Sequence, residues 1–319
     1  MWALNPAQLV LAVGLDLVLG DPRGWPHLAK AAGGLSTRYE RMLSYFGKRS
    51  IGAGLLFWLA VCGTMLGAYF ILVWGCGRFL GEWGRWVVWF LNTAIIYQSV
   101  AARDLARHVC AVIEPLNAGD LPGARARLAW IVGRDTAELD HEAISRAAIE
   151  SVAESTSDGV IAPLFWAALA GAPGALLYRT VNTLDSMVGH RNERYENFGK
   201  VSARADDLLN WLPARICALS FWIFIPGLRW STLRAEAAQH ASPNAGWSEA
   251  AMAYALDVRL GGGNCYDGVQ LPGPVFNAAG RAPSVPAIVA SLSWMWRASA
   301  IGFVCALTSA LVIKLLSTY

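Results

Sequence analysis

Carboxylates recur four residues apart near the middle of the chain. Glu150, Glu154 and Asp158 lie in "AIESVAESTSDG" and would share one face if a helix continues that far. Such a row suits magnesium, which prefers oxygen ligands and often binds through carboxylates and substrate phosphates. The alternative is a solvent-exposed ion pair between Arg146 and Glu150. The row leads directly into the apolar stretch "DGVIAPLF", and this favours a functional role.

A polar stretch, "NTLDSMVGHRNERYENFG" (182–199), follows an almost wholly apolar segment. Asn182 and Asp185 come first, and Arg191 and Arg194 follow. An acid for a metal beside arginines for phosphate is the pairing that phosphoryl chemistry needs. A basic cluster that contacts anionic lipid is the alternative. Lipid contact would explain the arginines but not Asp185 or Asn182.

A third stretch, "ARADDLLNWLPAR", places Asp206, Asp207 and Asn210 within one helical turn, next to Arg204 and Arg215. At most one of the two adjacent aspartates can face the same side as Asn210. A capped helix start would account for one aspartate without any chemistry.

Acidic residues also occur near the N-terminus, in "DLVLGDPRGWPH". Asp16 lies inside an apolar segment, where an acid is a functional candidate, and Asp21 could simply shape the Asp-Pro turn. The glycine-rich stretch "LGGGNCYDG" (260–268) does not match GxxxxGK[ST], and neither does any other part of the chain. His27, His108 and His240 are isolated, and the six cysteines form no CxxC pair.

Composition indicates a membrane protein. The chain of 319 residues is 55% hydrophobic and only 15% charged, whereas soluble domains carry about 25% charged residues. The net charge of +3 is too small to argue for nucleic acid.

The apolar segments predict an all-α polytopic membrane protein with about four to six membrane segments. The candidate spans are 3–19, 51–74, 86–101, 298–316 and, less clearly, 208–228. Pro163 and "GAPG" (171–174) break the segment 160–181, which predicts a re-entrant hairpin. No strand pattern is present.

We expect a single membrane-embedded domain over 1–319 with three polar loops. Residues 102–158 form a helical cytoplasmic loop, with one helix that ends before Pro115 and another that Asp120 caps. The other two are an active-site loop, 182–207, and a glycine-containing loop, 230–285. The side of the membrane on which 230–285 lies depends on whether 208–228 crosses the bilayer. Basic residues in 20–50 place that loop in the cytoplasm, and the hairpin keeps 182–207 on the same side.

Several stretches in order resemble the adenosylcobinamide-phosphate synthase family of cobalamin biosynthesis, the CobD/CbiB family. They are "GDPRGWPH", "WIVGRDT", "AIESVAESTSDGVIAPLFW", "LYRTVNTLDSMVGHRNERYENFG", "SARADDLLNWLPAR" and "SPNAGWSEAAMAYALDVRLGGGNCYDG". The resemblance implies a multi-pass enzyme of the inner membrane whose site faces the cytoplasm. It would join the amine of (R)-1-aminopropan-2-ol phosphate to a propionate carboxylate of adenosylcobyric acid, with ATP and magnesium. A homo-oligomer or a complex with other corrinoid-pathway enzymes is compatible with this role.

Two positions depart from the family pattern. Ser155 stands where the family usually has Asn, and Arg179 stands where it usually has Lys. Arginine keeps the charge but not the proton-transfer chemistry of an amine, so a catalytic lysine is not expected at this position.

We expect one cytoplasmic pocket that gathers these groups, with an acyl phosphate as the activated carboxylate. The expected catalytic residues are Glu154, Asp185 and Asp207, of which Glu154 or Asp207 takes the amine proton. Magnesium would be held by Glu150, Glu154, Asp158 and Asp185. The nucleotide and phosphates would be bound by Arg134, Arg179, Asn182, Arg191, Arg204 and Asn210. A membrane sensor of the β-lactamase-induction type and a corrinoid transporter are the alternatives.

Overall fold

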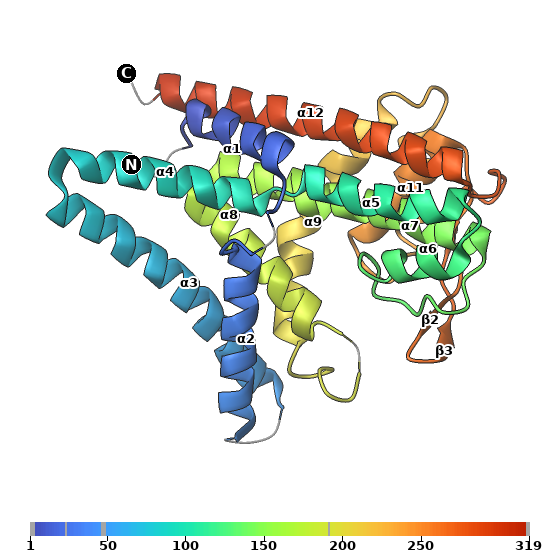
Figure 1. The fold of residues 1–319 in the computed structure, drawn as a ribbon, viewed down its shortest axis with the longest axis horizontal. Coiled ribbons are helices and arrows are strands. Elements are labelled where there is room, and N and C mark those ends of the chain that lie inside the picture. Colours follow the sequence, from blue (N-terminus) through green and yellow to red (C-terminus); the bar gives the residue numbers. More distant parts are fainter. Residues whose placement is uncertain (1–3, 23, 46–48, 191, 317–319) are drawn as a thin grey trace. The chain divides into compact units, whose positions relative to one another are not determined.

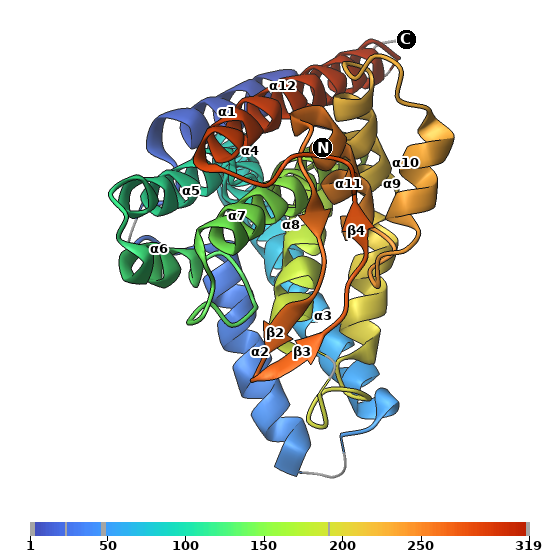
Figure 2. The same ribbon diagram turned by 90° about the vertical axis from the view of Figure 1, so that its right-hand side faces the viewer.

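The computed structural model describes residues 4–22, 24–45, 49–190 and 192–316 (Figures 1 and 2). Contacts divide the chain into two units. The first comprises 1–101, 162–209 and 303–319, and the second comprises 102–161 and 210–302. The two units are described separately, and the expected single domain over 1–319 stays a prediction.

The first unit consists of helices. Its elements are α1 (Pro6–Leu19), α2 (Leu28–Tyr45), α3 (Ile51–Phe79), α4 (Gly81–Ser99), α8 (Ala162–Val188), the start of α9 (Lys200–Trp222) and the end of α12 (Val285–Leu316). Helix α8 packs against α2, α3 and α4. A small apolar core lies around Phe57 and Phe198, whose ring centroids are 4.9 Å apart.

The second unit contains the remaining helices and four very short strands. The helices are α5 (Ala102–Asn117), α6 (Leu121–Leu128), α7 (His141–Thr156), a π-helical turn (Ser157–Ile161), the end of α9, α10 (Trp230–Ala237), α11 (Ala245–Leu256) and the start of α12. Their apolar sides form one core that includes Ile144, Phe221 and Met252.

The predicted membrane fold class is confirmed. Among the described residues, three helical stretches are long and apolar enough to cross a bilayer, namely Ile51–Phe79, His141–Val188 and Val285–Leu316. The first and third contain the predicted spans 51–74 and 298–316, and the shorter apolar helix Pro6–Leu19 corresponds to the predicted short span. The predicted spans 86–101 and 208–228 overlap α4, which ends at Ser99, and α9, which ends at Trp222, and neither helix belongs to this set.

The break predicted at 171–174 is confirmed. Gly171 has φ 65° and ψ −155°, so the helical path stops there inside α8. A Cβ atom added to Gly174 would overlap the carbonyl oxygen of Trp166 and would lie 2.7 Å from the Cβ of Ala170. In a straight helix, Trp166 and Gly174 would lie about 12 Å apart along the axis, because they are eight residues apart. The chain therefore folds back on itself at Gly171, and its re-entry into a bilayer stays a prediction.

The helices predicted within 102–158 are present, with one correction. Helix α5 contains Pro115 and ends at Asn117, so the prediction that it stops before Pro115 is wrong. Proline in the last turn removes only one helical hydrogen bond, and the helix continues for two residues beyond it. Asp120 caps α6 as predicted, because its Oδ1 accepts a hydrogen bond from the Gly123 N–H at 2.9 Å.

The strands are the feature that the sequence pattern did not predict. Strand β1 (Leu260–Gly261) pairs with β4 (Val275–Phe276), and β2 (Asn264–Tyr266) pairs with β3 (Val269–Leu271), both antiparallel. Strands of two or three residues are too short to show an alternating pattern.

Candidate active site

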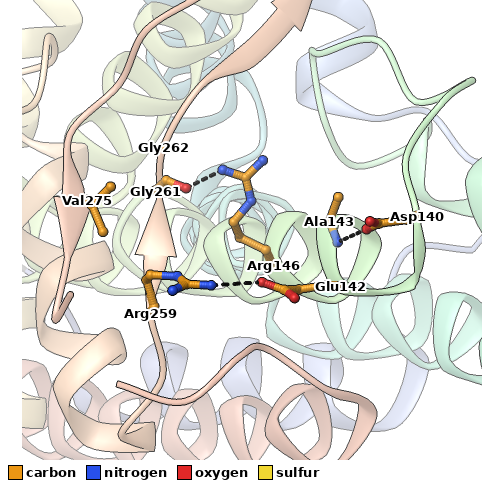
Figure 3. Close-up of a pocket in the computed structure, with 8 residues that line it drawn as sticks. All are labelled: Asp140, Glu142, Ala143, Arg146, Arg259, Gly261, Gly262 and Val275. Atoms are coloured by element: carbon orange, nitrogen blue, oxygen red, sulfur yellow. Dashed lines mark hydrogen bonds and ion pairs between the residues drawn. The ribbon is translucent and has the colours of Figure 1, made fainter. Parts of the chain in front are cut away.

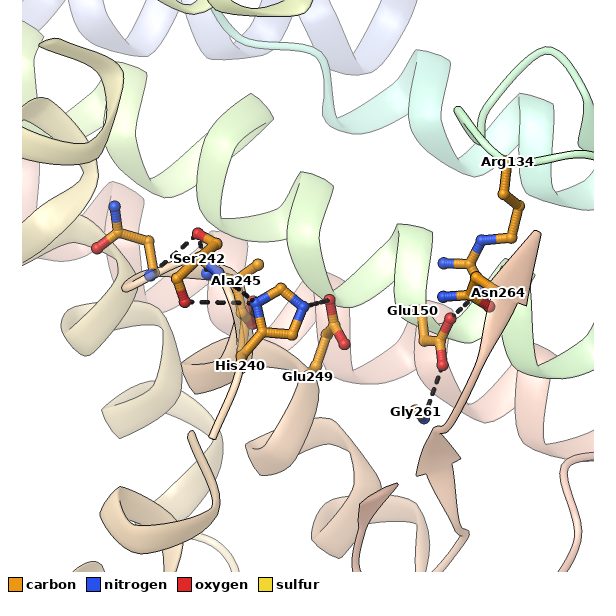
Figure 4. A network of polar contacts seen from close by, with 10 residues as sticks. Arg134, Glu150, His240, Ser242, Ala245, Glu249, Gly261 and Asn264 are labelled. Atoms are coloured by element: carbon orange, nitrogen blue, oxygen red, sulfur yellow. Dashed lines mark hydrogen bonds and ion pairs between the residues drawn. The ribbon is translucent and has the colours of Figure 1, made fainter. Parts of the chain in front are cut away.

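A buried carboxylate on α7 anchors the network in Figure 4. Glu150 is only 3% exposed. Its Oε2 lies 2.6 Å from Nη1 of Arg134, and its Oε1 accepts a hydrogen bond from the Gly261 N–H at 2.7 Å. The alternative of an exposed Arg146–Glu150 pair is therefore wrong, since Glu150 is buried and pairs with Arg134.

Arg146, one turn before Glu150, holds the glycine-rich stretch. Its guanidinium donates to the carbonyl oxygens of Gly261 and Gly263 and to Oδ1 of Asn264. Gly261 has φ 80°, and a Cβ atom there would overlap the carbonyl oxygen of Pro274. The glycine is needed because two backbone segments approach closely, and this differs from the role of glycine in a phosphate-binding loop.

Arg134 joins this network from the loop before α7. Burial alone would lower its pKa, but the charge of Glu150 and the hydrogen bond to Glu150 raise the pKa overall. Its Nη1 also donates to Oδ1 of Asn264 at 2.8 Å. The guanidinium therefore has two acceptors, a carboxylate and an amide oxygen.

A further acid, Glu249, comes from α11 and was not among the predicted site residues. It is 7% exposed, and α11 packs against α7. Burial raises the pKa of Glu249 well above its ordinary value of 4.5, the negative charges of Glu150 and Glu154 raise it further, and Arg134 and Arg146 oppose this. Its only signal in the sequence is its place in "GWSEAAMA", inside a family-like segment.

His240 faces Glu249, with Nε2 3.9 Å from Oε1 (Figure 4). Burial lowers the pKa of His240, which favours the neutral ring. Nδ1 lies 3.0 Å from the backbone nitrogen of Ser242 and 3.3 Å from its carbonyl oxygen, so these contacts hold the ring with Nε2 toward Glu249. No pattern in the sequence links His240 with an acid nine residues later.

The other two acids of the predicted row differ in their surroundings. Glu154 is exposed, one turn after the buried Glu150. Asp158 lies in the π-helical turn that follows α7, so the regular four-residue spacing ends before it. Within the described ranges, no group of three or more His, Cys, Asp or Glu side chains is arranged to hold a metal ion.

A cavity of about 350 Å³ opens beside Arg146 (Figure 3). Its wall contains the start of α7, strand β1 and Val275. Arg259 pairs there with Glu142 at 3.2 Å, and both side chains are 49% exposed. Arg146 and Arg259 therefore line the same cavity, but only Arg146 reaches the buried network.

In the first unit, the acids of α8 and α9 make local contacts. Asn182 donates to Oδ1 of Asp206 at 3.3 Å, so Asp206 is the aspartate that faces Asn182. The Asp185 carboxylate lies against Gly189, because a Cβ atom added there would overlap its Oδ1. Asp207 is half-buried on α9, and its catalytic role stays a prediction.

The predicted basic groups lie in several places. Arg179 on α8 has a buried Nε with no hydrogen-bond partner in the described part of the chain. Arg204 is exposed in the first unit, and Asn210 is buried in the second. Arg191 lies outside the described residues. The expectation that residues of both units share one pocket stays a prediction.

The last basic group of the 182–199 stretch has an acidic partner. Arg194 lies 2.9 Å from Oε1 of Glu40, which also pairs with Arg49 at 2.9 Å. Both guanidiniums lie over the Tyr195 ring, 5.1 and 5.6 Å from its centroid. This contact joins the stretch to α2.

The fold and these contacts define a polytopic helical membrane protein that carries a buried network of carboxylates and guanidiniums. The family model described as "CobD/Cbib protein" matches residues 9–295. The chain belongs to this CobD/CbiB family.

Relatives cover nearly the whole chain. A protein of Citrobacter koseri named "Cobalamin biosynthesis protein CobD" is 42% identical over 89% of this chain and 91% of its own length. A protein of Klebsiella pneumoniae with the same name is 42% identical over 90% and 92%. The "Cobalamin biosynthesis protein CbiB" of Salmonella arizonae is 41% identical over 89% and 91%. No solved structure matches.

Proposed function

We propose that this chain is an adenosylcobinamide-phosphate synthase of the cell membrane. It would join (R)-1-aminopropan-2-ol phosphate to adenosylcobyric acid through an amide bond, at the expense of ATP. Family membership and the names of the relatives support a role in cobalamin biosynthesis. They favour this role over the sensor and the transporter.

The observation that carries the proposal is the network of the second unit. Glu150 of α7 pairs with Arg134 there, the charges of Arg134 and Arg146 act on Glu249 of α11, and both acids are buried. Amide ligation needs cationic groups for phosphates and a carboxylate to take a proton from the amine. The network contains both kinds of group.

We assign the proton transfer to Glu154. Its carboxylate is exposed, so a substrate amine can reach it, whereas Glu150 is enclosed by Arg134 and Gly261. The carboxylate of adenosylcobyric acid would attack the terminal phosphorus of ATP, and an acyl phosphate would form as ADP leaves. The amine would then displace phosphate and lose its proton to Glu154.

Magnesium is compatible with some of the predicted ligands. Glu154 and Asp158 supply carboxylate oxygens, the donors that magnesium prefers. Both oxygens of Glu150 already accept hydrogen bonds, so we leave Glu150 out of this site. When bound, magnesium would neutralise charge on the transferred phosphoryl group.

Anion binding in the first unit is assigned to Arg179. A buried guanidinium nitrogen without an acceptor is costly, and an anionic ligand would supply that acceptor. The phosphate of either substrate has suitable oxygens.

Paired variants in native membranes test the proposal. Membranes containing the wild-type protein should form the amide product from adenosylcobyric acid, the amine, ATP and magnesium. Glu154→Gln should lower the rate by about 100-fold or more, the typical contribution of a positioned acid or base. Glu142→Gln is the matched control, because Glu142 lies on the same helix and pairs with the exposed Arg259. Equal rates for Glu154→Gln and the wild type would remove Glu154 from the mechanism.

A further inference from the structure

The chain at the end of α9 exposes an apolar turn in the second unit. Leu219 is 44% exposed, Ile223 is 54% exposed and Phe224 is 52% exposed. Nε1 of Trp222 donates a hydrogen bond to the carbonyl oxygen of Leu228 at 2.8 Å, so the chain closes into a compact turn after the helix. A cluster of exposed apolar side chains on a structured segment marks an interaction surface.

The uncharged run that contains this turn is too short to cross a bilayer. It comprises residues 216–228, between Arg215 and Arg229. As one continuous helix it would span about 20 Å, whereas the hydrocarbon core of a bilayer is about 30 Å thick. The part of α9 before Arg215 is no better suited, because it carries the charged side chains of Lys200, Arg204, Asp206 and Asp207.

Both ends of this run contact the same later segment of the chain. Before the run, the Arg215 guanidinium donates to Oδ1 of Asn244 at 3.1 Å and to the carbonyl oxygen of Pro243 at 3.3 Å. After the run, α10 packs against α11, and the rings of Trp230 and Trp247 lie 5.2 Å apart, centroid to centroid. The run therefore leaves this part of the second unit and returns to it.

The exposed turn lies beside the point where α12 becomes wholly apolar. The ring centroids of Phe224 and Trp294 are 6.2 Å apart. The Arg297 guanidinium lies 4.9 Å from the centroid of the Trp294 ring, and the next charged residue of α12 is Lys314. Tryptophan at the start of an apolar span is typical of the membrane–water interface. The turn is thus level with the predicted entry of α12 into the bilayer.

We propose that Leu219, Ile223 and Phe224 insert into the bilayer at its interface and that α9 does not cross it. Hydrocarbon is the occupant because the turn continues the exposed surface of α12, a helix long and apolar enough to span a membrane. Apolar groups inserted in this way reach about 5–10 Å into the boundary between headgroups and acyl chains. The segment 208–228 then contributes a surface anchor in place of a span.

This anchor fixes the side of the three polar loops. Arg134 contacts Asn264 and Arg146 contacts Gly263, so the loops 102–158 and 230–285 lie on one side of the membrane. The chain between these loops contains α8 and α9, whose crossings must be even in number. Because α9 does not cross, α8 returns to the side on which it begins. The loop 182–207 therefore lies on the same side as the other two.

A depth measurement tests the insertion. A nitroxide-labelled amino acid would replace Ile223 in the full chain in nanodiscs, and paramagnetic resonance would report its access to oxygen and to a water-soluble nickel chelate. Oxygen should reach the label and the chelate should not, at a depth of about 5–10 Å. Gln239, exposed just after α10, is the matched control position, where the chelate should reach the same label.

Chemical labelling of sealed membrane vesicles tests the side of the loops. Glu193→Cys reports on 182–207 and Gln239→Cys reports on 230–285, and both positions are exposed. Cys110, exposed in 102–158, is a natural reference in every sample. A membrane-impermeant maleimide should modify all three positions from the same face, and mass spectrometry would identify the modified peptides.

Three results would overturn the anchor. Equal access of the chelate to the labels at 223 and 239 would place the turn in water. Spin–spin broadening between labels at 223 would assign the turn to a contact with a second copy of the chain. A depth near the bilayer centre, about 15 Å, or labelling of Glu193→Cys and Gln239→Cys from opposite faces, would make α9 a span. Neither measurement depends on amide formation, so failure of the proposed ligase would leave the anchor standing.

Discussion

The buried pair of Arg134 and Glu150 should make a large, non-additive contribution to stability. Its side chains are 13% and 3% exposed, so water screens the interaction weakly. Removal of one partner from a buried pair costs about 3–5 kcal/mol, because the remaining charge loses its partner. Arg134→Met should fall in this range, since the Gly261 N–H is then the one donor left to Glu150 among the described residues. Glu150→Gln should cost somewhat less, because Asn264 still accepts from Arg134.

A double-mutant cycle measures this coupling. Arg134→Met with Glu150→Gln should cost clearly less than the sum of the single variants, with a coupling energy of about 2–3 kcal/mol. Pulse proteolysis and tryptophan-monitored unfolding in detergent would give the free energies of unfolding. Both readouts follow the folded chain and do not depend on activity.

A second cycle provides the control. Arg259 and Glu142 form an ion pair of similar composition, but both side chains are 49% exposed. Exposed pairs contribute about 0.2–1 kcal/mol. Equal coupling in the two cycles would refute the reasoning, because burial would then not distinguish the pairs.

Three further substitutions probe other parts of the fold. Gly261→Ala should destabilise the protein by about 2 kcal/mol more than Gly268→Ala. Both positions have φ near 80°, so alanine has the same backbone cost of about 1–2 kcal/mol at each. Between these two positions, only the Cβ at Gly261 would meet backbone atoms. Equal unfolding midpoints for the two variants would contradict this close approach. Gly174→Ala should lower the thermal unfolding temperature, because its Cβ would overlap the preceding part of α8 at the break near Gly171. Gly67→Ala, with open space around it, should leave that temperature unchanged or raise it slightly. Glu249→Gln should raise the unfolding temperature more at pH 8 than at pH 5. The pKa of Glu249 is raised in the folded state. Its contribution to the free energy of unfolding is therefore complete below the unfolded-state pKa and is lost as pH rises through the folded-state pKa. An equal gain in unfolding temperature at both pH values would count against a raised pKa.

The sequence predicted the features that depend on composition and local signals. Apolar blocks long enough to cross a bilayer gave the helical membrane class, and "GAPG" gave the break at Gly171. Asp120 was recognised as a cap because capping uses a residue and its near neighbours. The short strands near 260–276 were missed, since their pairing depends on contacts rather than on a repeating pattern.

The contacts around the predicted site residues depend on packing that the sequence does not reveal. The row of acids was singled out by its spacing and its role stays a prediction, but spacing alone could not show that Glu150 is buried and bound to Arg134. Glu249 and His240 were not assigned to the predicted site, because the packing of α11 against α7 places Glu249 there and His240 lies against Glu249. Long-range contacts of this kind leave no periodic signal in a single sequence.

Oxygen transfer from the corrinoid carboxylate tests the central claim most directly. The purified protein in nanodiscs would receive adenosylcobyric acid labelled with ¹⁸O in its free carboxylate, together with ATP, magnesium and (R)-1-aminopropan-2-ol phosphate. An acyl phosphate places one labelled oxygen in inorganic phosphate for each amide formed, and mass spectrometry of both products should show this ratio. Amide formation with unlabelled phosphate would contradict the acyl phosphate, and the absence of any amide would contradict the proposed ligase.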